Sequence, residues 1–362
     1  MVSGRFLFAT WDGGGNVPPV LALAEQLLAR GHRVVAIGSD TLAPRFSTAG
    51  VDFVARDPLH EWDQAALATD VAREAATADV VVSDYMVPGA LCGAEAAGRP
   101  NVALVHTLYA ANLDPSGGLG PMHVAATEDG LAALRTGLGL PPVEGFGGLL
   151  ARADAVLVTS PQELDQPGDR PANVRYVGPL LESAGPDAGW RPPGVDDSRP
   201  IVVVGLGTTP MGEVPVLQRL LSALSEAPVR LLVTVGAHVD VDDLELPSNA
   251  HVVGHVRHAA LLPWASAIVC HGGLGSVLAA LAHGLPVVSV PLGREQPHNA
   301  AAVERAGAGL TLATDASGDA IRTAVRRATS DLELRASAAR LALAIDELIR
   351  AAPAVQALEQ HL

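Results

Sequence analysis

Cysteine, aromatic residues and basic charge are all scarce in this chain of 362 residues. The two cysteines, Cys92 and Cys270, lie in apolar surroundings, so we expect buried thiols in a reducing compartment rather than a disulfide framework. Lysine and arginine number 24 against 39 aspartates and glutamates, which disfavours a nucleic-acid partner and a basic membrane-docking face. Only 3% of the residues are aromatic, so we expect few stacking platforms for a flat ligand.

Long hydrophobic runs are also missing. No stretch of the chain approaches the about 18 uninterrupted apolar residues that indicate a transmembrane helix. The run from Arg5 to Thr10 is broken by Asp12 before it could form a signal-peptide core. We therefore expect a cytoplasmic protein without stable membrane insertion, whose partners are small molecules. A homodimer stays open.

What the chain does have is apolar residues, 49% of the total, in short runs. Its length suits two domains of about 150 to 200 residues. In both halves short apolar strands alternate with helical patterns, which predicts parallel sheets with helices on both faces. The helix that begins at Val17 is typical, because Pro18 fits a first turn and Gly31 closes the last one. We expect an α/β fold of two doubly wound, Rossmann-like domains.

The two series are separated by a segment around residues 182–199 that is rich in proline, glycine and aspartate and has no periodicity. This pattern predicts one domain over residues 1–185, a linker over 186–199 and a second domain over 200–345. The last segment, residues 331–362, is helical in pattern and rich in alanine, leucine and arginine, and the C-terminal helix is expected over 346–362.

The strongest functional signal is the glycine-rich turn His271-Gly272-Gly273-Leu274-Gly275-Ser276, between a buried strand and a helix over 276–283. Free backbone N–H groups and the positive end of the helix dipole converge on such a turn, which favours an anion. The glycines let a diphosphate approach closely, and His271 and Ser276 can donate to its oxygens. Further along, Glu295 and Gln296 supply a carboxylate and an amide that could hold sugar hydroxyls. The pattern predicts a nucleotide-sugar site.

The run from His255 to Leu312 contains all of these residues and resembles the donor signature of the family 1 glycosyltransferases, particularly the actinomycete enzymes that decorate natural products. Shorter similarities lie at 13–19, 81–84 and 204–209, in the family's order. The resemblance implies the GT-B fold, in which the first domain binds the acceptor, the second binds the donor across a cleft, and a C-terminal helix, here 346–362 with a bend at Pro353, crosses back. It also implies an inverting, metal-independent hexosyltransferase that needs a nucleotide-sugar co-substrate and no cofactor.

Carried over by this resemblance, the donor site includes the turn residues Thr208 and Thr209, the base-binding Val256, and His271, Gly272, Gly273, Gly275, Ser276, Glu295 and Gln296. Arg257 and His258, beside Val256, depart from the family's pattern. Many members that use UDP-sugars have a glutamate where this chain has Ala279, and that carboxylate bonds both ribose hydroxyls. Because a deoxyribose has one hydroxyl fewer, Ala279 favours a dTDP-activated deoxysugar over a UDP-sugar.

The acceptor side departs from the family's pattern at the residue that should act as the general base. Attack by an alcohol requires removal of its proton, and the family provides a histidine before the first helix, oriented by an aspartate. Here Asn16 stands at the histidine position and Asp84 at the aspartate position. Asn16 is expected to cap the helix at Val17, and Asp84, our preferred base, competes with Asp12 and His106 for that role. Alternatively, an amine, an acidic phenol or an activated aromatic carbon would need no strong base.

Two further predictions complete this interpretation. We expect acceptor-side loops over 112–121 and over the glycine run 144–149. The alternatives to a transferase acting on a small natural-product aglycone are a nucleotide-sugar epimerase of the same architecture and an inactive donor-binding homologue that assists a partner.

Overall fold

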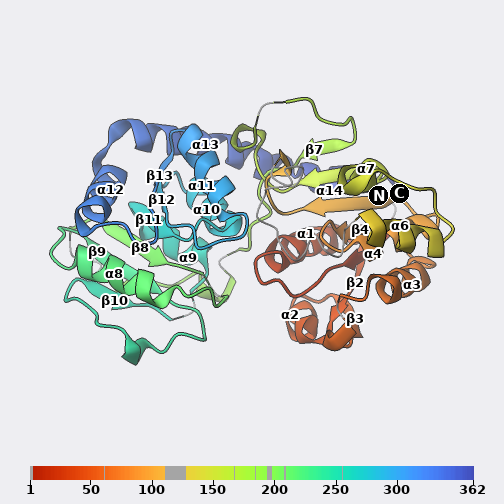
Figure 1. Cartoon of the computed structure of the whole chain (residues 1–362), viewed down its shortest axis with the longest axis horizontal. Helices are drawn as coiled ribbons and strands as arrows, with labels where there is room; N and C mark the ends of the chain where they lie inside the picture. Colours follow the sequence, from red (N-terminus) through yellow and green to blue (C-terminus); the bar gives the residue numbers. More distant parts are fainter. Residues whose placement is uncertain are drawn as a thin grey trace. The chain divides into compact units, whose positions relative to one another are not determined.

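The computed structural model describes residues 3–60, 62–110, 128–166, 168–183, 185–193, 198–207, 209–254 and 256–362. The chain forms two compact units (Figure 1). The N-terminal unit comprises Met1–Gln162, Pro167–Leu180 and Leu348–Leu362, and the C-terminal unit comprises Glu163–Gln166 and Leu181–Glu347. The contacts thus start the main segment of the C-terminal unit, Leu181–Glu347, at Leu181, whereas the sequence pattern put the first boundary at residue 185, followed by a linker over 186–199.

In the N-terminal unit, the described residues form a seven-stranded parallel sheet with the order β3-β2-β1-β4-β5-β6-β7. The strands are β1 (Arg5–Ala9), β2 (Arg33–Ser39), β3 (Asp52–Arg56), β4 (Val80–Asp84), β5 (Asn101–Val105), β6 (Ala155–Val158) and β7 (Val174–Tyr176). The order reverses between β1 and β4, which pair directly. The segments that leave these two strands therefore meet at the carboxyl edge of the sheet, the usual ligand position in such folds.

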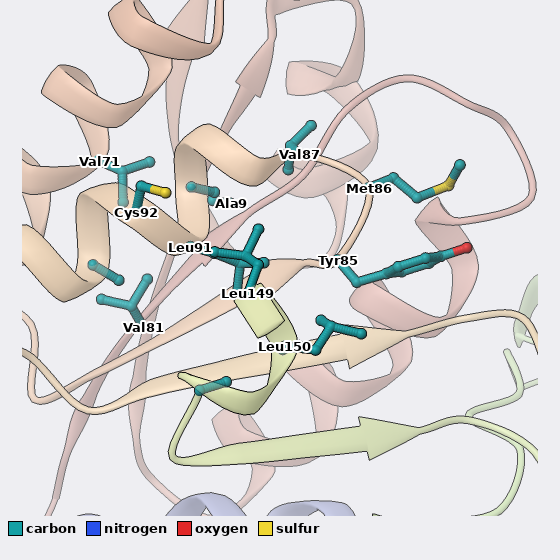
Figure 2. Close-up of a cluster of buried hydrophobic side chains, with 14 of the residues drawn as sticks. Ala9, Val71, Val81, Tyr85, Met86, Val87, Leu91, Cys92, Leu149 and Leu150 are labelled. Carbon is teal, nitrogen blue, oxygen red and sulfur yellow. The ribbon is translucent and has the colours of Figure 1, made fainter. Parts of the chain in front are cut away.

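Helices cover both faces of this sheet because alternate strand residues point to opposite sides. Phe6 and Phe8 of β1 belong to one apolar cluster, and Leu7 and Ala9 belong to the other. Figure 2 shows part of the second cluster, including Val71, Leu91 and Leu149 from three different helices. The helices of this unit are α1 (Val17–Ala29), α2 (Ala43–Thr48), α3 (Gln64–Ala75), α4 (Pro88–Ala96), α6 (Glu128–Gly137), α7 (Gly145–Ala151) and α14 (Pro353–Glu359).

The C-terminal helix returns to the first unit, as the resemblance implied. Ala352 adopts a left-handed conformation with φ of 45°, and Pro353 then begins α14 at the predicted bend. Val355 and Leu358 of α14 are buried in the cluster that α1 also covers. Glu359 accepts a hydrogen bond from Arg30 at 2.9 Å, at the end of α1. Burial and this ion pair together attach the last helix to the N-terminal unit.

The C-terminal unit repeats the same plan. Its described residues form a six-stranded parallel sheet with the order β10-β9-β8-β11-β12-β13, which reverses between β8 and β11. Its strands are β8 (Ile201–Gly205), β9 (Arg230–Thr234), β10 (Ala250–Val252), β11 (Ala267–Cys270), β12 (Val287–Ser289) and β13 (Gly309–Thr311). Its helices are α8 (Val214–Leu224), α9 (His258–Leu261), α10 (Leu274–Ala282), α11 (Gln296–Arg305), α12 (Gly318–Ser330) and α13 (Leu332–Ala351), whose end enters the first unit. The predicted α/β class is confirmed in both units.

The expectation for the glycine run 144–149 is wrong, because this segment begins a helix, α7. Phe146, Leu149 and Leu150 recur at helical spacing, and all three pack into the cluster of Figure 2. Burial of these side chains outweighs the low helix propensity of the glycines. The expected loop over 112–121 lies outside the described residues.

Both cysteines are fully buried and unpaired, as predicted. No described helix is both long enough and apolar enough to cross a membrane.

A buried ion pair joins α4 to α6. Arg135 is 1% exposed and donates to both carboxylate oxygens of Glu95, at 2.8 and 3.2 Å, and to the carbonyl of Pro141 at 2.6 Å. Burial by itself would raise the pKa of Glu95, but hydrogen bonds from Arg135 and Arg152 hold that pKa below its ordinary value. The pair therefore stays charged at neutral pH.

Replacing Arg135 by alanine should lower the free energy of unfolding by about 3 kcal/mol, because it leaves Glu95 short of its buried partner. Arg152→Ala is the matched control, since the Arg152 side chain is 49% exposed and its loss should cost about 1 kcal/mol or less. Urea denaturation of both variants measures the difference. Equal costs would contradict the assignment of the buried pair as the structural one.

Candidate functional site

The glycine-rich turn lies where β11 ends and α10 begins. Gly273 is the N-cap residue of α10, so the helix starts at Leu274, two residues before the predicted start. Gly272 has a φ of 84°, which L side chains rarely adopt, and its carbonyl accepts a hydrogen bond from Asn299 Nδ2 at 3.0 Å. Ser276 lies in the first turn of the helix, where backbone N–H groups lack intrahelical acceptors. The turn thus presents the donors expected for an anion site.

The imidazole of His271 is enclosed by two glycines. A Cβ atom on Gly207 would lie 3.2 Å from Cε1 of the ring, and one on Gly273 would lie 2.4 Å from Nε2. Gly207 follows β8 and Gly273 caps α10, so both sides of the strand-order reversal hold the ring. A side chain at either position would displace it. These glycines therefore have a packing reason in addition to access for a ligand.

His271 is uncharged at neutral pH. Burial, assisted by the nearby positive charges of His258 and Arg294, lowers the pKa of His271 to about 4, against an opposing effect of Glu213. Its Nδ1 is buried and has no hydrogen-bond partner among the described residues. A neutral ring offers a diphosphate one N–H donor and no formal charge. An unpaired buried ring nitrogen in such a turn calls for a functional explanation.

Two residues near this ring escaped the sequence analysis. The Glu213 carboxylate, 3% exposed, accepts a hydrogen bond from Met211 N–H at 2.8 Å and forms an ion pair with His238. Burial would raise the pKa of Glu213, but these two hydrogen bonds hold it below its ordinary value. Glu213 precedes α8 and His238 follows β9. Because they are far apart in the sequence and match no motif, only the fold brings them together.

Gln296 holds a neighbouring loop, and its expected contact with a sugar hydroxyl stays a prediction. It is 2% exposed, and its Oε1 accepts hydrogen bonds from the N–H groups of Leu292 at 2.7 Å and Gly293 at 3.2 Å. Its Nε2 contacts Met211 Sδ at 3.3 Å. The amide is thus engaged in holding the loop before α11. The half-buried Glu295 keeps its predicted sugar-facing role as a prediction.

The other residues predicted to bind the nucleotide-sugar differ in burial. Gly275 is exposed, and Thr209 and Val256 are half-buried. Thr208 lies outside the described residues. Arg257, next to Val256, is tied to an earlier segment because its N–H donates to Asp187 at 3.1 Å.

On the acceptor side, the structure brings together three of the four predicted catalytic residues. Asn16 Nδ2 donates to Asp84 Oδ2 at 2.9 Å, and His106 Nε2 lies 3.1 Å from Asp84 Oδ1. Asp12 is exposed and accepts a hydrogen bond from Thr41 at 2.6 Å. These contacts link Asn16, Asp84 and His106 at the carboxyl ends of β1, β4 and β5.

Asn16 occupies the N-cap position of α1, as expected, but its side chain does not cap the helix. Asn16 has helical φ and ψ of −82° and −23°, and its side chain makes no capping hydrogen bond. Its Oδ1 accepts from Gly13 N–H at 3.0 Å, and its Nδ2 also contacts the Trp11 carbonyl at 2.9 Å. The Oδ1 that a cap would offer to the helix N–H groups is thus taken by Gly13, and Nδ2 donates to the buried Asp84 carboxylate, which needs donors.

An aromatic pair adjoins this network, although aromatic residues are rare in the chain. The rings of Trp11 and Trp62 lie 4.9 Å apart at 57°, and Trp62 is 41% exposed. Trp11 immediately follows Thr10, whose hydroxyl faces Asp84, and Trp11 packs over Gly13. Neither tryptophan was singled out from the sequence, because single aromatic residues carry no motif.

Comparisons with known proteins agree with the donor turn. Residues 218–359 match the family model described as the C-terminal domain of erythromycin biosynthesis protein CIII-like proteins. The 4'-demethylrebeccamycin synthase of Lentzea aerocolonigenes is 28% identical over 93% of this chain and 94% of its own length. These matches show that the chain is a glycosyltransferase, similar to the family 1 enzymes that its donor turn resembles.

Solved structures extend this result to the whole architecture. The calicheamicin glycosyltransferase CalG4 is 26% identical, with a TM-score of 0.79 over 99% of this chain and 98% of that one. The glycosyltransferase of kitacinnamycin gives a TM-score of 0.80 over 99% of each chain, at 22% identity. A rhamnosyltransferase of Mycobacterium bovis named for PGL/p-HBAD biosynthesis is 37% identical, but over only 52% of this chain and 41% of its own. The glycosyltransferase therefore has the predicted GT-B fold.

The low pKa of His271 makes the stability of this glycosyltransferase depend on pH. As pH falls below the ordinary pKa of 6.5, the unfolded chain takes up a proton that the folded ring refuses until about pH 4. Stability is therefore lost on acidification, by about 2 kcal/mol between pH 7 and pH 5 from this group. Urea denaturation at both values should show a smaller loss for His271→Gln. Replacement of the exposed His251 is the control, and equal pH dependence of His271→Gln and wild type would contradict the prediction.

Proposed function

We propose that this glycosyltransferase moves a deoxysugar from a dTDP donor, with inversion, onto a small natural-product aglycone. The observation that carries the proposal is the turn at α10, where the buried, unpaired His271 Nδ1 and the free N–H groups of the helix start lie together. Relatives support the acceptor class, because their names include a rebeccamycin synthase and a demethyllactenocin mycarosyltransferase.

The proposed chemistry is a single displacement. The acceptor oxygen attacks the anomeric carbon, the bond from that carbon to the diphosphate breaks, and the departing dTDP keeps the electron pair. The acceptor proton passes to a base. Negative charge grows on the diphosphate, where the N–H groups at the start of α10 and the His271 ring stabilise it. Because these donors supply the stabilisation, the proposal includes no metal and no cofactor.

The dTDP preference rests on Ala279, which is 5% exposed on α10. No carboxylate is available at this position to bond two ribose hydroxyls, so a deoxyribose loses nothing there. Two structural neighbours support this, since VinC was solved in complex with dTDP and the spinosyn rhamnosyltransferase SpnG in complex with thymidine diphosphate.

Calorimetry should find tighter binding of dTDP than of UDP to the unmodified enzyme. A ratio of about tenfold corresponds to about 1.4 kcal/mol. His271→Ala should weaken both nucleotides alike, because the diphosphate is common to them, and it therefore serves as the control for the site itself. Tighter binding of UDP would refute the deoxyribose argument.

Replacing His271 by alanine should reduce kcat/KM by an amount equivalent to about 2 to 4 kcal/mol, because a donor to the developing charge is lost. The matched control is His283→Ala, at the other end of α10, where the ring contacts the Ala279 carbonyl at 2.8 Å. Steady-state kinetics of the two variants measure the difference. Full activity of a folded His271→Ala enzyme would remove this residue from the reaction.

The function is tested by incubating the protein with dTDP- and UDP-sugars and with alcohol, phenol and amine acceptors, in the presence of EDTA. Mass spectrometry should detect a glycosylated acceptor and free dTDP, with activity unaffected by the chelator. An altered sugar nucleotide without transfer would indicate the epimerase alternative. Donor binding without any turnover would indicate the inactive homologue, for which the asparagine at position 16 is the motivating observation.

A further inference from the structure

His106 lies at the place where three neighbouring strands end. It directly follows β5, and β5 pairs with β4 so that Leu104 stands opposite Asp84. β4 in turn pairs with β1, whose following segment carries Asn16. All three side chains therefore reach the same part of the carboxyl edge from adjacent strands.

Asp84 is unsuited to accept a proton from a ligand. Its side chain is 0% exposed, and both oxygens are occupied. Oδ1 accepts from Met86 N–H at 3.0 Å and faces His106, while Oδ2 accepts from Asn16 at 2.9 Å and faces the Thr10 hydroxyl at 3.5 Å. These donors stabilise a buried carboxylate and leave no lone pair directed at an acceptor.

His106 has a free lone pair that could accept a proton, which Asp84 lacks. Because a carboxylate oxygen can only accept, the Nε2 of His106 at 3.1 Å carries the proton, and Nδ1 keeps a free lone pair in the neutral ring. Within the described part of the chain, Nδ1 has no hydrogen-bond partner, and the side chain is 9% exposed. The ring also packs against the edge of Tyr85, with centroids 5.0 Å apart. The base-competent nitrogen is thus oriented and reachable.

Asn16 completes the arrangement from a buried position. It is 2% exposed, and its Oδ1 is occupied by Gly13 N–H, which fixes the amide so that Nδ2 points to Asp84. An amide gives this carboxylate a donor that cannot lose its proton. The carboxylate is therefore held by one fixed donor on one oxygen and by the imidazole on the other.

We propose that His106 is the general base of the reaction and that Asp84 and Asn16 are its positioning residues. The proposal rests on the proposed glycosyl transfer. Nδ1 of His106 takes the proton of the acceptor hydroxyl while its oxygen bonds to the anomeric carbon, and the bond from that carbon to the departing diphosphate breaks. The imidazolium that forms is stabilised by Asp84 and then releases its proton to water.

The first test is the dependence on acceptor acidity. His106→Ala should lower kcat on an aliphatic alcohol by about 10²-fold or more, the usual share of general-base catalysis, and lower it much less on an acidic phenol. Affinity for dTDP, measured by calorimetry, should be unchanged, because the donor turn lies in the other unit. The matched control is His60→Ala, an exposed histidine of the same unit. Added imidazole should restore part of the rate of His106→Ala.

A second test examines the coupling of His106 to Asp84. Asp84→Asn should lower kcat in the wild-type background and have little further effect in His106→Ala, because both changes disable one base. If Asp84→Asn does not fold, the His106 series alone decides. Equal losses on alcohol and phenol, or retention of the wild-type rate by His106→Ala, would overturn the assignment. Absence of transfer by the wild-type enzyme would instead overturn the proposed function.

Discussion

The reversal of strand order in each sheet is the constraint on which both candidate sites depend. At such a reversal, the segments that follow the two adjacent parallel strands turn to opposite sides of the sheet. Ligands of open α/β sheets usually bind there, at the carboxyl ends of the strands. In the N-terminal unit the reversal lies between β1 and β4, and in the C-terminal unit between β8 and β11. The acceptor-side network gathers at the first reversal and the donor turn at the second.

The two sites solve the problem of a buried ionisable group in opposite ways. His271 is enclosed by glycines and loses its charge, because burial with few partners disfavours the protonated ring. Asp84 is buried more deeply and receives donors on both oxygens from Asn16, Met86 and His106. A neutral donor suits a diphosphate that already lies at a helix start, and a fixed carboxylate suits the orientation of a neighbouring imidazole.

Much of the fold and of the donor turn was predictable. The strand Ala267–Cys270 and the glycines after it identified the turn, because a glycine needed for close approach leaves a mark in the sequence. The glycines from Gly145 onward led to the wrong prediction of a loop. Leu149 and Leu150 bury enough apolar surface to form a helix in spite of these glycines. Gln296 was recognised as part of the site, but its hydrogen bonds to the preceding loop depend on a backbone path that no motif encodes.

By itself the sequence determined the α/β class, the glycine-rich turn between a strand and a helix, and the absence of a histidine at position 16, because these depend on local pattern and residue identity. Only the tertiary structure decided which side chains contact the Asp84 carboxylate. Asn16, Asp84 and His106 stand far apart in the chain, and their distances follow from the pairing of β1, β4 and β5. Asn16 could equally have capped α1. Its Oδ1 instead accepts from Gly13 N–H, and its Nδ2 donates to the buried Asp84, a contact that exists only once the strands are paired.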